Sequence, residues 1–220
     1  MVRWFDSLHL CLALVPLVIY LLVLGWLNLR RRGTIVSGFS DALLLGFAVC
    51  GLVIVGPMEL FFPEMAAFRM GPWVWLLLLG LYALLVVLLG LSQRPRLIFY
   101  NIDLDTAQRL TIEAASPIDA EVQQLEDCLV LPQQRLQLHL HRSPVFRNVQ
   151  LTALGEEHNL IAWNGLRRNL QQSPPQRTTP TRAGYAMLAL ALLLMVSLAA
   201  LSVADHQEIA RGFGELLRRE

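Results

Sequence analysis

Two carboxylates that are two residues apart, Asp103 and Asp105, follow the apolar segment 97–100. Paired carboxylates at the end of a strand hold divalent metals in enzymes that act on phosphate groups. Ala107 stands where a dehalogenase-type phosphatase carries Thr or Val, and the chain has no lysine to complete such a site. Aspartate also caps helices readily. We therefore expect Asp105 to cap a helix and Asp103 to be solvated, with no metal bound.

Two histidines, His139 and His141, alternate with leucines and so share one face of a predicted strand. Some metal sites use histidines at this spacing, but a metal needs at least a third ligand. The nearest candidates are the side chains at 156–158, in the next turn. The pattern therefore favours a solvated strand face over a metal site.

The remaining reactive residues form no catalytic set. Cys11 and Cys50 lie in apolar runs and Cys128 in a polar region, without the CxxC spacing of a zinc site or the even count of a disulfide framework. All 18 basic residues are arginine, which excludes a P-loop lysine, a Schiff base and a Ser–Lys dyad. We predict no catalytic, cofactor-binding or metal-binding residues, and a protein that is not an enzyme.

The composition indicates a membrane protein. Apolar residues make up 55% of the chain and charged residues 16%, against about 45–50% and about 25% in soluble domains. Three runs are long enough to cross a bilayer as helices: 8–29, 73–91 and 183–204. A fourth, 42–58, lies between Asp41 and Glu59 and is shorter, so it is either a span or a re-entrant helix.

Arginine is distributed unevenly about these four predicted spans, and the cytoplasmic side normally holds the excess. Nine arginines lie near the membrane on one side and five on the other, which places both termini outside. The inside set is Arg30, Arg31, Arg32, Arg94, Arg96, Arg167, Arg168, Arg177 and Arg182. The outside set is Arg3, Arg69, Arg211, Arg218 and Arg219.

The predicted spans contain one ionisable residue, His9, near the outer end of the first. Transport pathways usually need buried charges, broken helices or internal repeats, and apart from Pro16 the spans show none. Small residues in the second and fourth spans instead indicate close helix packing within the chain. They are Gly46, Ala48, Gly51, Gly56, Ala186, Ala189, Ala199 and Ala200.

Residues 93–172 read as a soluble α+β domain inserted between the third and fourth helices. Strands are expected at 96–102, 129–131, 136–141 and 148–154, and helices from Asp105 and at 157–172. The segment 118–127 is ambiguous, because its apolar residues have helical spacing but it is short. The last helix should pack through Leu160, Trp163, Leu166 and Leu170. The order of elements predicts an antiparallel sheet with helices on one face. A proline-rich linker, 173–182, and an amphipathic tail, 205–220, complete the chain.

These features together predict an α-helical multipass membrane protein with four transmembrane helices and a small cytoplasmic α+β domain. The arginine-only usage suggests a bacterial gene, and the location is then the cytoplasmic (inner) membrane. A net charge of +1 gives no reason to expect nucleic acid binding. The expected partners are the lipid bilayer and other membrane or cytoplasmic proteins. The function favoured is interaction, scaffolding or regulation; the alternatives are a transporter or channel component, and an enzyme using Asp103 and Asp105.

Overall fold

The chain folds into two compact units. The computed structural model describes residues 7–30, 32–125, 128–142, 148–154, 159–173 and 181–204. The helical unit comprises the described parts of 1–23, 42–89 and 187–220, and the sheet unit those of 24–41 and 90–186. Of the predicted linker and tail, residues 174–180 and 205–220 lie outside the described residues.

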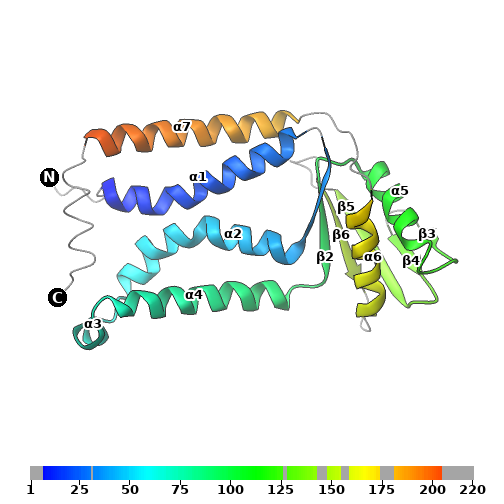
Figure 1. Ribbon diagram of the computed structural model, residues 1–220, viewed down its shortest axis with the longest axis horizontal. Helices are drawn as coiled ribbons and strands as arrows, with labels where there is room; N and C mark the ends of the chain where they lie inside the picture. Colours follow the sequence, from blue (N-terminus) through cyan, green and yellow to red (C-terminus); the bar gives the residue numbers. More distant parts are fainter. Residues whose placement is uncertain are drawn as a thin grey trace. The chain divides into compact units, whose positions relative to one another are not determined.

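In the described part of the chain, four helices are long and apolar enough to cross a membrane (Figure 1). They are α1 (Ser7–Leu29), α2 (Gly38–Val53) continued by the π-helical turn η1 (Ile54–Met58), α4 (Trp73–Ser92) and α7 (Arg182–Ala204). A short helix, α3 (Glu64–Met70), precedes α4. The helices predicted at 8–29, 73–91 and 183–204 are confirmed, with both ends within one residue.

The second candidate span is longer than the sequence indicated. It covers Gly38–Met58, 21 residues, where 42–58 was expected. The Ser37 Oγ accepts the N–H of Ser40 at 3.2 Å, the arrangement of a helix N-cap. Asp41 lies in the first turn, where the helix dipole favours a carboxylate. Pro57 has no N–H for the usual helical bond, which explains the π-helical turn near the other end.

Two of the predicted small residues bring helices of the helical unit together. A Cβ added to Gly51 would overlap the backbone carbonyl oxygen of Leu12 in α1. The Gly46 carbonyl oxygen accepts a hydrogen bond from the Tyr82 hydroxyl of α4 at 2.7 Å. A Cβ at Gly56, by contrast, would meet nothing within 4 Å. The packing role expected of Gly46 and Gly51 within the chain is therefore present, and that of Gly56 is not.

The described residues of the sheet unit form six strands in the order β1-β2-β6-β5-β4-β3, and every neighbouring pair is antiparallel. The strands are β1 (Thr34–Ser37), β2 (Arg96–Tyr100), β3 (Gln123–Leu125), β4 (Cys128–Leu131), β5 (Leu136–Arg142) and β6 (Val149–Leu154). Five of them lie between α4 and α7 in sequence. The sixth, β1, lies between α1 and α2, in a segment for which the sequence analysis expected no strand.

β1 is a full member of the sheet. Ile35 is paired with Phe99 and Val36 with Ile98 of β2. Ile35 also packs, partly buried, against the core beneath the sheet. The connection between α1 and α2 therefore completes the domain that otherwise follows α4.

Helices α5 (Leu104–Ala115) and α6 (Leu160–Gln172) cover one face of the sheet and share its core (Figure 1). The antiparallel sheet with helices on one face agrees with the pattern of the sequence. Fully buried side chains from alternate strand positions meet those of the helices. They include Leu97, Phe99, Leu129, Leu138, Leu151, Leu166 and Leu170.

The helix caps differ from the sequence-based prediction. Asp103, and not Asp105, is the N-cap of α5: its backbone is extended and its side chain accepts the N–H of Thr106. Asp105 lies in the first turn. Both positions suit an aspartate, since a cap needs an acceptor and the first turn favours a negative charge, so residue type alone did not distinguish them.

The start of α6 was also placed too early. Asn159 is its N-cap and accepts the N–H groups of Ile161 and Ala162. Leu160 is 58% exposed and does not pack, whereas Trp163, Leu166 and Leu170 are buried as expected. Leu160 is exposed because it is the first residue of α6 and comes before the helical turn that packs on the sheet.

Candidate functional site

The second face of the sheet, opposite α5 and α6, is divided into a buried part and an open part. Ile98 and Tyr100 of β2 are 3% and 5% exposed. Across β5, Gln137 and His141 are exposed and His139 is half-buried. The prediction of a polar face on this strand is confirmed. We call the surface formed by Gln137, His139, His141 and their half-buried β6 neighbours Gln150 and Thr152 the open face.

The described residues of the open face bring together few possible metal ligands. His139 lies opposite Cys128 of β4 on one side and Thr152 of β6 on the other. No group of three or more His, Cys, Asp or Glu side chains in the described residues could hold a metal ion. The third ligands considered from the sequence, at 156–158, lie outside the described residues.

The two carboxylates that follow β2 do different things. The Asp103 Oδ2 accepts hydrogen bonds from the Thr106 N–H at 3.2 Å and from its hydroxyl at 3.0 Å. Asp103 is therefore engaged in capping, and the expectation that it is simply solvated is wrong. Asp105 lies two residues later, in the first turn of α5. This geometry accounts for an Asp at position 103 without a metal.

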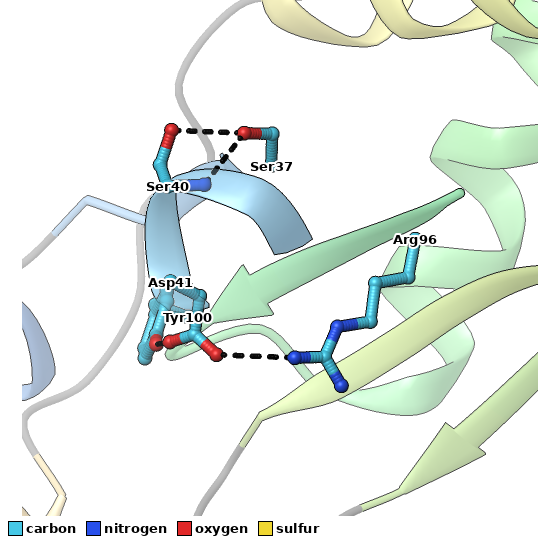
Figure 2. Close-up of polar contacts among 5 residues, drawn as sticks. All are labelled: Ser37, Ser40, Asp41, Arg96 and Tyr100. Carbon is cyan, nitrogen blue, oxygen red and sulfur yellow. Dashed lines mark hydrogen bonds and ion pairs between the residues drawn. The ribbon is translucent and has the colours of Figure 1, made fainter. Parts of the chain in front are cut away.

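A polar junction joins β2, the strand next to the edge strand β1, to the first turn of α2 (Figure 2). The Tyr100 hydroxyl donates a hydrogen bond to the Asp41 Oδ1 at 2.6 Å. The Arg96 Nη2 lies 3.7 Å from the Asp41 Oδ2. Because Arg96, Ile98 and Tyr100 alternate along β2, both polar partners reach Asp41 from the same face of the sheet. The sequence analysis treated Asp41 only as the boundary of a span.

A second junction lies within the sheet unit between the end of α1 and the start of α7. The carbonyl oxygen of Asn28, a fully buried residue, accepts from the Thr181 N–H and hydroxyl, both at 3.4 Å. A Cβ added to Gly184 would come within 3.0 Å of the Asn28 Cβ. The end of α1, the start of α2, the end of α4 and the start of α7 thus all belong to the sheet unit.

One ionisable pair lies in the helical unit. The His9 Nε2 is 3.0 Å from the Glu59 Oε2, and the two side chains are 25% and 27% exposed. His9 is the first residue of its candidate span, and Glu59 follows the last residue of another. The pair therefore lies at the ends of two candidate spans. It does not by itself form a transport pathway through them.

Comparison of the chain with models of protein families, with curated protein sequences and with solved structures finds no match in any of the three. Proposals about function accordingly come from the residues and contacts of this chain.

Proposed function

We propose that the protein is a non-enzymatic integral protein of the bacterial cytoplasmic membrane that presents its α+β domain to a protein partner. The domain lies on the cytoplasmic side, where it serves interaction, scaffolding or regulation. The open face of the sheet makes the contact with the partner, which is another membrane protein or a cytoplasmic protein.

The observation that supports this proposal best is the open face. Buried leucines on the other side of β5 account for the fold, but Gln137, His139 and His141 make no contribution to that core. Polar groups that can donate and accept hydrogen bonds, spread over a rigid strand, are suited to a specific protein contact. The proline-rich linker predicted at 173–182 is not needed as a mobile tether for this role. The connection between α1 and α2 already joins the sheet through β1.

The orientation has separate support. One end of each candidate span belongs to the sheet unit, and the sequence segments next to those ends carry nine of the arginines counted above, against five elsewhere near the membrane. An excess of arginine beside span ends is typical of the cytoplasmic side.

Affinity purification of the full chain in mild detergent, with identification of the co-purifying proteins, tests the proposal. The decisive variant replaces Gln137, His139 and His141 with serine. A matched control replaces Asn164, Arg168 and Gln171, three exposed residues on the outer side of α6, with serine.

Loss of a partner from the open-face variant alone, with unchanged circular dichroism, is the expected result. The proposal fails if the set of co-purifying proteins is the same for the wild type and both variants. It also fails if both variants lose the partner equally, since the contact would then not be specific to the open face.

A further inference from the structure

A small pocket lies within the sheet unit beside the Asp41 junction. Its volume is about 100 Å³, well below the ~300–1,000 Å³ of sites that enclose a drug-sized ligand. A small group, rather than a whole metabolite, fits such a space. The residues that define its character are Gly38, Gly90, Arg94, Arg96, Trp163 and Arg167.

The lining is strongly basic. Three arginines contribute to it, and no acidic residue does. The Asp41 Oδ2 lies 3.7 Å from the Arg96 Nη2 and offsets one of the three charges. Arg94 and Arg167 are exposed, and no ion pair of either is present in the described part of the chain. The pocket therefore carries a surplus of positive charge toward any ligand.

Arg96 provides a second, independent indication of a ligand. Its Nε is buried and has no hydrogen-bond partner among the described residues. A Cβ at Gly38 would overlap Cγ, Cδ and Nε of the same side chain, so the absence of a side chain at Gly38 is what allows Arg96 to lie there. The Nε is buried against Gly38, but 28% of the Arg96 side chain is exposed, so its terminal N–H groups can donate to an anion in the pocket.

The covalent structure places the pocket at a membrane surface if α2 and α4 span. Gly38 begins one candidate span and Gly90 is two residues from the end of another. Arg94 and Arg96 follow that end directly. Basic pockets between span ends bind the headgroups of anionic lipids, and guanidinium groups match the geometry of phosphate oxygens. Trp163, 6% exposed, adds an apolar wall of the kind found at headgroup level.

We propose that this pocket binds the phosphate of an anionic phospholipid headgroup, through Arg94, Arg96 and Arg167. Bound lipid links the start of α2, the end of α4 and helix α6 of the domain. The inference rests on the membrane location proposed above. It is independent of the protein partner, so failure to bind lipid leaves the co-purification result unaffected.

The test measures thermal unfolding of the full chain in mild detergent while phosphatidylglycerol is titrated. Phosphatidylcholine and inorganic phosphate are titrated in parallel. Ligand that binds the folded state raises the unfolding midpoint. The variant is Arg94→Gln with Arg167→Gln. The control, Arg142→Gln with Arg168→Gln, removes the same charge from exposed positions outside the pocket.

Phosphatidylglycerol should stabilise the wild type at lower concentration than phosphatidylcholine does. The pocket variant should bind phosphatidylglycerol at least on the order of tenfold more weakly, because each arginine near an anionic lipid contributes to the binding free energy. The control should stay within about twofold of the wild type on the same scale. The unfolding midpoint without lipid shows whether each variant folds, and Arg167→Gln alone repeats the test if the double variant does not.

Three results would overturn the proposal. Equal weakening in both double variants would show a general effect of surface charge. No stabilisation by phosphatidylglycerol would show that the pocket does not bind this headgroup. Stabilisation by inorganic phosphate at the same concentrations as the lipid would identify free phosphate as the ligand and exclude a lipid-specific site.

Discussion

The contact between Tyr100 and Asp41 should couple the stability of the sheet to that of the first turn of α2. The experiment is a double-mutant cycle with Tyr100→Phe, Asp41→Ala and the combined variant. Tyr100→Phe removes one hydroxyl and keeps the ring, which is 5% exposed. Asp41→Ala removes the acceptor of the Tyr100 bond and the partner of Arg96.

The expected coupling follows from the geometry. A hydrogen bond to a charged group contributes ~1.5–3 kcal/mol, and the 2.6 Å distance is typical of a charge-assisted O–H···O bond. The side chain of Asp41 is 20% exposed, so solvent screening reduces this value. We expect a coupling free energy of about 1–2 kcal/mol between the two substitutions.

The assay is denaturant unfolding of the full chain in detergent, followed by circular dichroism. Tyr185→Phe is the control, because it removes a hydroxyl from a residue that is 60% exposed, and it should change the free energy of unfolding by less than about 0.5 kcal/mol. A coupling within about 0.3 kcal/mol of zero would refute the reasoning, since independent sites add within that margin.

Five further substitutions have distinct expected effects on the unfolding of the full chain. Asp103→Ala should cost about 1 kcal/mol through loss of the cap, and Asp105→Ala only a few tenths; the reverse order would restore Asp105 as the cap. Asp119→Ala should cost about 2 kcal/mol, because this carboxylate is 1% exposed and accepts two backbone N–H groups; a change below about 0.5 kcal/mol would contradict that. Gly51→Ala should lower the unfolding midpoint in detergent, since its Cβ would overlap backbone of α1. Gly80→Ala, which meets nothing within 4 Å, should leave the midpoint unchanged or raise it; equal losses would contradict the packing account.

The four long apolar helices and the central strands could be predicted because their signals are local. Runs of apolar residues give the helices directly, and the alternation of leucine with polar residues in β5 gives both faces of that strand. The sequence could not decide whether Asp103 or Asp105 is the N-cap of α5, since an aspartate is favourable at the cap and in the first turn of a helix. Only the backbone conformation at Asp103 decides which of them is the cap.

The failure to predict β1 from the sequence has a different cause. Thr34–Ser37 contains β-branched residues, the signal that could have revealed it, but it is four residues long and pairs with residues about sixty positions later. A pairing so distant leaves no periodicity in the sequence. The Asp41 junction depends on that pairing, so the residues of the junction could not be brought together without β1. The role of Asp119 could not be predicted for the same reason, since its carboxylate accepts the N–H of Gln133, fourteen residues later.

The most direct test of the central claim is the location of each end of the spans across the membrane. Cys11, Cys50 and Cys128 are first replaced by alanine, and single cysteines are then placed at Arg69, in the last turn of α3, or at Gln133, in the turn before β5; both positions are exposed. A membrane-impermeant maleimide applied to intact cells should label the cysteine at Arg69. The cysteine at Gln133 should be labelled only after the membrane is opened. Labelling at Gln133 in intact cells, or equal labelling at both positions, would contradict a four-span protein with its sheet unit in the cytoplasm.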